Sequence, residues 1–475
     1  MQTTQKFGDV IVRCAIAILA IALSGSNSSS ATPPVSEPPA PTKAPASLSA
    51  SQRAPYSADE KHPWNELHRE FFVRTSRDGG QHLHTTDPHL YRGGTWLLEG
   101  KSHETAIRLL DRFLASSSDR LIDHAAKRLM LQRDLWGAFD YAAWYPDDWV
   151  FKSSREPAAK TLRGRLARSI GRLALEPGEI DALQDNYAQA VKERTFLPDY
   201  EPSHPERPFL PDSLFDAHGP WVRFHEATAE PMASRHFDGA GGRAAHVIFL
   251  RLPEGREATE AYLAGLSRDT ITEYSAQGEA EANEQEVARF GVIPKRWRPI
   301  TQFPQGTMVA MVRRALAVDS ESKLRATPIT ELVQIRVYRR IPCDPRANKL
   351  NGDFGEQDVF EFALDRQELY AGRPGLRLVG PDALIESFER REPDPYADDA
   401  RRVDAISCTR SCIECHQAPG VYSMLSMERG FNNPLGVKFR EYAWDVEMRY
   451  TTMAKVKGYE WGLLQGLLEG APRGR

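Results

Sequence analysis

The sequence is poor in cysteine, in surplus charge and in long hydrophobic runs, and each shortage excludes a class of protein. Five cysteines in 475 residues are too few for a disulfide scaffold, so their positions matter more than their number. The 61 Lys and Arg residues against 65 Asp and Glu residues give a net charge of -4, which argues against a nucleic-acid partner. A mean hydropathy of -0.50 and only one long apolar run exclude a polytopic membrane protein.

The common catalytic signatures are missing as well. The sequence holds no P-loop, dinucleotide-binding fingerprint, nucleophile elbow or HExxH zinc motif. Its composition, with 41% hydrophobic and 27% charged residues, is nevertheless that of a folded protein. The length is sufficient for roughly two or three packed domains.

The amino terminus has the features of an export signal. Lys6 and Arg13 precede an apolar stretch over Cys14–Leu23, and Ala22-Leu23-Ser24 places small residues at the -3 and -1 positions of a signal-peptidase site. The stretch is about half as long as the roughly 20 residues that a membrane span requires. We therefore predict a cleaved signal peptide over residues 1–24, with a membrane tether through an uncleaved terminus as the alternative.

Apolar periodicity predicts a helical module after a disordered tether. Residues 25–58 are rich in Ser, Ala and Pro and have too few large apolar residues to fold. Spacing of i, i+3/i+4 and i+7 predicts a helical module over residues 59–197. The expected helices cover Trp64–Phe71, Ile107–Leu114, Ile122–Trp136, Pro157–Ile170 and Pro177–Val191. Closely spaced prolines between Pro198 and Pro211 then mark a boundary or a long loop.

Beyond these prolines the apolar period changes to two, which predicts strands. The expected strands cover Ala245–Leu252, Met308–Val318, Val333–Val337 and Phe360–Leu364, with a helix over Glu257–Tyr274. Residues 213–390 are thus predicted to form an α+β module whose antiparallel sheet is covered on one side. Pro393-Asp394-Pro395 marks a second break. The predicted fold class is α+β, with residues 396–475 as a helical C-terminal segment that includes a helix over Asp398–Ile406.

One motif in this C-terminal segment is specific. Cys412-Ile413-Glu414-Cys415-His416 has the arrangement C-x-x-C-H, which would arise by chance in a chain of this composition about once in 700 sequences. Two residues between the thiols place them one helical turn apart, close to the distance between the two vinyl groups of haem. The motif resembles the haem-attachment site of the c-type cytochromes. The resemblance covers the motif and at most residues 396–475.

The resemblance implies one covalently bound haem c, with thioether bonds from Cys412 and Cys415 and the proximal bond to iron from His416. Haem c is attached outside the cytoplasm in that family, which agrees with the export signal. The implied location is the periplasm or cell surface of a bacterium, and the implied activity is one-electron transfer with a redox partner protein. The Gly/aromatic helix pairing usual before the motif is not evident between Asp398 and Ile406, so we expect part of the haem pocket to come from the middle module.

Three other interpretations use the same cysteines. Cys408 extends the motif to C-x3-C-x2-C, the spacing of radical-SAM iron-sulfur proteins, but those are cytosolic and carry it near the start of a barrel. Zinc could bind Cys408, Cys412, Cys415 and His416, although no second C-x-x-C or H-x3-5-H completes the usual pair. A thioredoxin-like C-x-x-C requires a βαβ context that the preceding stretch does not show.

The sixth haem ligand would decide between an electron carrier and an open site. Met453 precedes the apolar run of a final helix and is the best-placed distal ligand, although a core methionine is the alternative. The further candidates are Met448, Met424 and Met427.

Several histidines need an assignment too. His82, His84 and His89, with His62 and His68 nearby, are interpreted as surface histidines, and a copper site or a distal haem ligand is the alternative. His225 and His246 fall on expected strands and are interpreted as core residues.

Two alternative functions remain open. An open haem site would make the protein a peroxidase-like enzyme or a sensor, an alternative suggested by the roughly 400 residues that a simple carrier does not need. In the other alternative, the body is a binding module and haem is a structural element.

The resemblance also leads to a disulfide prediction. If haem takes Cys412 and Cys415, and Cys14 is removed with the signal, then Cys343 and Cys408 remain as a pair in an oxidising compartment. We predict a disulfide between them, with two unconnected buried thiols as the alternative. A free-thiol count on the unreduced mature protein is expected to find neither thiol. Two reactive thiols would rule the bond out.

Overall fold

The computed structural model describes residues 49–75, 81–83, 102–144, 152–226, 243–271, 301–342, 355–380, 384–388, 403–407, 416, 420–424, 439–441, 455–456 and 458–470. All of them belong to one compact unit, Ala46–Arg475. The helices in this part of the chain are α2 (Ala50–Arg53), α3 (Pro63–Phe72), α4 (Ser102–Ala115), η3 (Ser118–Arg120), α5 (Ala125–Trp144), α6 (Lys152–Arg172), α7 (Pro177–Asp181), α8 (Asn186–Lys192), α10 (Arg256–Ile271), α13 (Arg366–Tyr370), α15 (Val421–Met424) and α18 (Tyr459–Glu469). The strands are β1 (Val73–Thr75), β2 (Gln81–Leu83), β3 (Val222–Glu226), β4 (Ala244–Arg251), β5 (Met308–Val318), β6 (Leu324–Arg340), β7 (Glu356–Leu364), β8 (Leu376–Leu378), β9 (Leu384–Phe388), β10 (Val403–Ser407) and β11 (Phe439–Glu441).

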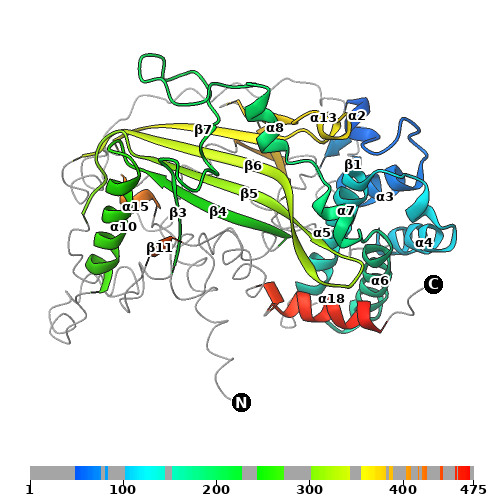
Figure 1. Cartoon of the computed structure of the whole chain (residues 1–475). Helices are drawn as coiled ribbons and strands as arrows, with labels where there is room; N and C mark the ends of the chain where they lie inside the picture. The colour runs from blue at the N-terminus through cyan, green and yellow to red at the C-terminus, as the bar shows by residue number, and fades with distance from the viewer. Residues whose placement is uncertain are drawn as a thin grey trace, which may run out of the picture. The chain divides into compact units, whose positions relative to one another are not determined.

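A single antiparallel sheet organises the protein. Seven of the described strands form it in the order β11-β3-β4-β5-β6-β7-β8, and β4 to β7 run side by side in Figure 1. The central strand β5 is buried over its whole length, as its apolar composition favours. The α+β class is therefore confirmed, and the bounds predicted for Met308–Val318 agree with those of β5.

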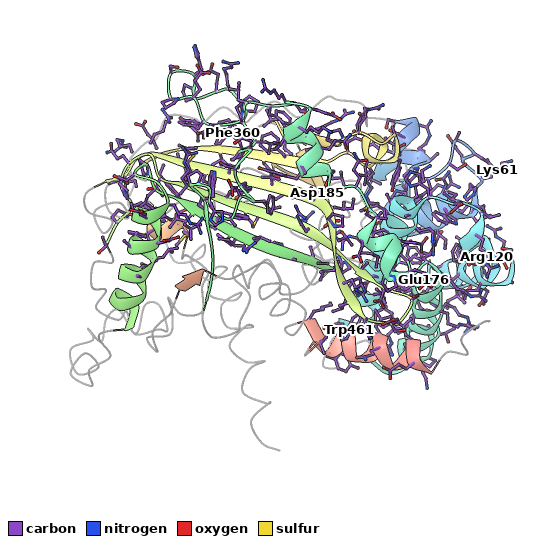
Figure 2. All side chains as sticks on the ribbon, viewed as in Figure 1. Lys61, Arg120, Glu176, Asp185, Phe360 and Trp461 are labelled. Atoms are coloured by element: carbon purple, nitrogen blue, oxygen red, sulfur yellow. The ribbon has the colours of Figure 1, made fainter. Side chains whose placement is uncertain are left out.

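The proline-rich segment covers one face of this sheet. Between α8 and β3 the chain forms no helix or strand beyond an isolated bridge between Leu197 and Phe209, which confirms a long loop. Phe209 is fully buried, and its ring lies 5.3 Å from that of Phe360 on β7, which Figure 2 labels. Prolines suit such a segment because it forms no helix or sheet ladder that a missing N–H would interrupt, and its apolar side chains still bury surface.

The opposite face of the sheet is also buried, so the expectation of a sheet covered on one side was wrong. On β6, Gln334 and Arg336 alternate with Val333, Ile335 and Val337. This pattern is typical of a strand whose polar side chains face solvent. Yet Gln334 is 7% exposed and Arg336 is 4% exposed. These polar side chains tolerate burial because they hydrogen-bond to each other, with Arg336 donating to Gln334 and Gln334 to Glu361.

The helices pack at the end of the sheet where β5 and β6 turn. Their core contains residues of α3 to α6 and α18 together with Leu316 and Val318 of β5 and Ile329 of β6. Trp136 on α5 and Trp461 on α18 have ring centroids 5.8 Å apart. Figure 2 labels Trp461. The hydrophobic core thus continues across the boundary that the prolines indicate in the sequence.

Most helices predicted within residues 59–197 are confirmed, but two of them need correction. Helix α6 begins at Lys152 and contains Pro157, which was expected to open it. A proline removes one N–H and crowds the carbonyl four residues earlier, which here lies in the first turn, so the rest of the helix is kept. The helix expected over Pro177–Val191 is divided into α7 and α8 because the Asp185 carboxylate caps α8, accepting from the Ala188 amide at 3.0 Å (Figure 2).

The C-terminal segment is not helical throughout, contrary to expectation. Val403–Ser407 forms β10, paired antiparallel with β9, where a helix over Asp398–Ile406 was predicted. β11 joins the central sheet beside β3. The β-branched Val403 and Ile406 favour a strand once a partner strand supplies hydrogen bonds, and the sequence does not show that partner. The apolar run near the C-terminus does form a helix, α18.

A buried ion pair fastens α5 to the sheet. The guanidinium of Arg133 donates to both carboxylate oxygens of Glu331 on β6, at 2.8 and 2.6 Å. Glu331 lies where the β5/β6 register shifts between Arg313 and Arg314, and Arg313 approaches the same carboxylate at 3.4 Å. Burial lowers the pKa of Arg133 to about 10, against the opposing effect of Glu331, so the guanidinium stays charged at neutral pH.

The next residue of α5 makes a second buried pair. Asp134 accepts from both terminal nitrogens of Arg366 on α13 at 2.8 Å and from the Tyr56 hydroxyl at 2.6 Å. His68 on α3 lies 3.6 Å from the same carboxylate. Asp134 therefore connects α5 to three segments that are distant in the sequence. Tyr56, which is 1% exposed, and α2 lie within residues 25–58, so the disordered tether expected there is wrong for residues 49–58.

Replacing Asp134 with Asn would leave the Arg366 guanidinium without its counter-charge, and we expect the free energy of unfolding to fall by about 3–5 kcal/mol. Asp111→Asn is the matched control, because Asp111 pairs with Arg165 at the surface. Such exposed pairs contribute about 0–1 kcal/mol. Urea unfolding at neutral pH measures both variants, and equal small losses would contradict the role of Asp134.

The same pair predicts a pH dependence. Burial alone would raise the pKa of the Asp134 carboxyl, but Arg366 and His68 hold it well below its ordinary value. When folding lowers the pKa of a carboxyl, that carboxyl stabilises the protein at pH values above its unfolded-state pKa, which is about 3.9 for Asp. The stabilisation is lost as the pH falls below that value toward the folded-state pKa. The difference in unfolding free energy between wild type and Asp134→Asn should therefore shrink below about pH 4. A difference that stays constant under acid would contradict this.

Candidate haem-attachment site

One of the three motif residues lies in the part of the chain that the structure describes. His416 belongs to it, whereas Cys412 and Cys415 lie outside the described residues. The two cysteines of the predicted disulfide, Cys343 and Cys408, and the predicted distal ligand Met453 also lie outside them. The geometry of the site is therefore built from His416 and the segment that follows it.

The imidazole of His416 is oriented by a backbone carbonyl. Its Nδ1 lies 2.7 Å from the carbonyl oxygen of Ser423, a residue of the short helix α15. A carbonyl oxygen only accepts, so Nδ1 is the nitrogen that carries the hydrogen and Nε2 carries the lone pair. Histidines that bind metals generally donate their other ring N–H to a carboxylate, a backbone carbonyl or water in this way.

The backbone of His416 is held by two further hydrogen bonds. Its carbonyl oxygen accepts from the Ser423 hydroxyl at 2.9 Å and from Nε2 of Gln357 at 3.3 Å. Ser423 thus closes the loop back onto His416 with both its carbonyl and its side chain. Gln357 lies on β7, so the motif histidine is fixed directly to the central sheet.

Helix α15 is held at its start by Gln302, in the segment that precedes β5. The Oε1 atom of Gln302 accepts from the Val421 amide at 2.7 Å. Gly420, just before the helix, has a φ of +55, and a Cβ there would collide with the Gln302 side chain. Gly420 therefore allows Gln302 to approach α15 closely.

An apolar cluster lies beside the His416 loop. Val421 is fully buried in it and Met424 packs against it. The other buried members come from the sheet, from α10 and from neighbouring loops: Val222, Ile248, Leu250, Leu252, Leu263, Leu266, Phe303, Val309, Met311, Leu332, Tyr338 and Ile341. The segment that follows His416 is thus anchored in an apolar part of the core.

The polar face of the sheet reaches the same loop. Nη1 of Arg336 donates to Oε1 of Gln357 at 3.3 Å, and Gln357 is the side chain that holds the His416 carbonyl. Tyr338, two positions further along β6, lies on the same face. Burial raises the pKa of Tyr338, and both Arg336 and Ser423 act to lower it. Arg336, Tyr338 and the His416 loop are therefore close neighbours.

The other histidines that the sequence singled out do not assemble into a metal site within the described residues. His62 caps α3, its Nδ1 accepting from the Trp64 amide at 3.2 Å, and His68 is buried beside Asp134. His82 lies on β2, while His84 and His89 fall outside the described part. His225 and His246 lie on β3 and β4, as predicted. In the part of the chain with an assigned structure, no group of three or more His, Cys, Asp or Glu side chains could hold a metal ion.

Sequence reasoning found His416 but missed the residues that hold it. Ser423 is seven positions away, whereas Gln357 and Gln302 are far off in the sequence. No local pattern marks either glutamine: Gln357 lies on β7, where a polar residue of an alternating strand is expected to face solvent, and Gln302 lies in the segment before β5.

Comparisons with protein-family models, with curated proteins and with solved structures found no match for this chain. Among the described helices, none combines the length and the apolar character needed to cross a membrane. The candidate site therefore has to be judged from its own geometry.

We expect haem-free protein to hold His416 as the Nδ1–H tautomer, measured by nitrogen NMR of the neutral imidazole. Gly420→Ala should lose this preference, because it displaces Gln302 and α15, and should destabilise the fold by about 1–2 kcal/mol for a left-handed alanine. Gly466→Ala on α18 is the matched control, since nothing lies within 4 Å of the added Cβ. A wild-type protein dominated by the Nε2–H tautomer would contradict the described geometry.

Proposed function

We propose that this chain is an exported c-type haem protein that transfers single electrons to or from a partner protein. The observation that carries the proposal is the hydrogen bond from His416 Nδ1 to the Ser423 carbonyl, in a histidine that completes a C-x-x-C-H motif. This tautomer places the lone pair on Nε2, the nitrogen through which a proximal histidine binds iron. The export signal predicted over residues 1–24 fits a haem that is attached outside the cytoplasm.

The residues present fit haem c. Cys412 and Cys415 would form the thioether bonds and His416 would bind the iron from the proximal side, as the motif implies. Ser423 and Gln357 hold His416 by its ring and its carbonyl, which fixes the direction of Nε2. When bound, haem supplies a centre that accepts and releases one electron.

The surrounding fold supports this role in a second way. An apolar cluster that includes Val421 and Tyr338 lies beside the segment that follows His416, and an apolar environment tunes the potential of a redox centre. Much of that cluster belongs to the central sheet and α10. This arrangement supports the expectation that the middle of the chain contributes to the pocket, and it gives the large body a role within an electron-transfer protein.

The sixth ligand stays a prediction. Met453 as the distal ligand would complete a low-spin electron carrier, as the family resemblance implies. Met424 is less suited to that role, because it packs into the apolar cluster on the short helix that also orients the proximal histidine.

Covalent haem is tested by a denaturing gel stained for haem peroxidase activity, on protein made in a host with periplasmic cytochrome maturation. We expect a haem-stained band at the mature mass, lost in Cys412→Ala because a thioether bond can no longer form at that position. Cys343→Ala is the matched control, a cysteine outside the motif, and should keep the stain. A wild-type protein that is exported and folded but unstained would refute the proposed function.

A further inference from the structure

Arg336 is a buried cation close to the proposed haem ligand. It is 4% exposed, and its guanidinium lies one side chain away from the His416 carbonyl, with Gln357 between them. Nε and Nη2 donate to Oε1 of Gln334 at 3.2 and 3.0 Å, and Nη1 donates to Oε1 of Gln357 at 3.3 Å. A guanidinium has five N–H donors, so these three bonds leave two for another acceptor.

The hydrogen-bond partners of Arg336 are neutral amides. Among the residues that the structure describes, no carboxylate lies within ion-pair distance of its guanidinium, and Glu361 is bound by Gln334 instead. Arg133 differs in this respect: it is also a buried arginine, but it donates two hydrogen bonds to the carboxylate of Glu331. Burial of a cation without a counter-charge is costly, which indicates that an anionic group belongs beside Arg336.

We propose that Arg336 binds a carboxylate of the haem that His416 holds. This inference rests on the proposed function, and it assigns the orientation of that haem: one propionate points toward β6 and β7. Haem c carries two propionates, and the planar fork of a guanidinium matches a carboxylate with paired hydrogen bonds. Arg336 shares its face of β6 with Tyr338, a member of the apolar cluster beside the His416 loop, so the ring and its carboxylate would meet neighbouring parts of one surface.

The pairing also predicts an electrostatic effect on the redox centre. Reduction adds one electron, and a buried cation held against the haem favours the more negative, reduced state. Arg336 therefore raises the reduction potential, while Gln334 and Gln357 keep its guanidinium in place.

The first experiment compares Arg336→Met in haem-loaded protein and in a haem-free background made by Cys412→Ala with Cys415→Ala. We expect the substitution to lower the folding equilibrium constant at least tenfold more in the haem-loaded protein, because only there is a carboxylate left without its partner. Urea unfolding measures the difference. Arg133→Met is the matched control: its carboxylate partner belongs to the protein, so its cost should be the same in both backgrounds.

The second experiment measures the midpoint potential of the haem-loaded variants. If the haem-free protein does not fold, this measurement by itself tests the inference. Arg336→Met should lower the potential by about 59 mV, a tenfold change in the reduction equilibrium, while Arg133→Met leaves it unchanged. An unchanged potential in Arg336→Met would overturn the inference, as would equal stability losses in the two backgrounds.

A free carboxylate is the other source of the same chemistry, and acetate is the probe for it. If acetate stabilises the haem-free protein and Arg336→Met abolishes this effect, the position beside Arg336 belongs to a free anion. That result would overturn the pairing with haem. No effect of acetate is expected. Failure of the proposed function would look different, since the wild-type protein would then carry no haem on a denaturing gel.

Discussion

The ion pair between Arg133 and Glu331 lies between the helices and the sheet, where water does not reach. Charges in such a place are stable only with close and well-aligned partners, so the pair fixes how α5 packs against β6. The register shift in β6 serves the same contact by directing Glu331 toward Arg133 and Arg313. Asp134, the next residue, repeats the arrangement with Arg366 and ties α13 to the same helix. Helices and sheet are thereby held as one core.

Burial of both faces of the sheet explains why so many polar side chains form networks. One face is covered by the loop that contains the proline cluster, and the other carries Gln334, Arg336 and Glu361 among apolar neighbours. A polar group without water must find a partner in the protein. On this face the network ends at the carbonyl of His416, which connects the sheet to the motif histidine. In the proposed account, the sheet is the wall of the haem pocket as well as the centre of the fold.

The sequence predicted the parts of the fold that depend on local pattern. The uninterrupted apolar run of β5 and the i, i+3/i+4 spacing of α3 and α4 led to the right elements, because burial of one face follows directly from such spacing. Two of the errors share one cause, a distant partner that a local pattern does not contain. β10 became a strand because β9 lies beside it, and Arg336 is buried because Gln334 and Gln357 bind it. His416 was found through its spacing to two cysteines, but Gln357 and Gln302 could not be found in that way.

The central claim is that the motif holds one covalent haem in an exported protein. Intact-protein mass spectrometry on the chain purified from the periplasm of a host with cytochrome maturation tests it most directly. The account predicts a chain that begins at Gly25 and is heavier than its polypeptide by the mass of one haem. An exported, folded chain with the mass of the polypeptide alone would contradict it.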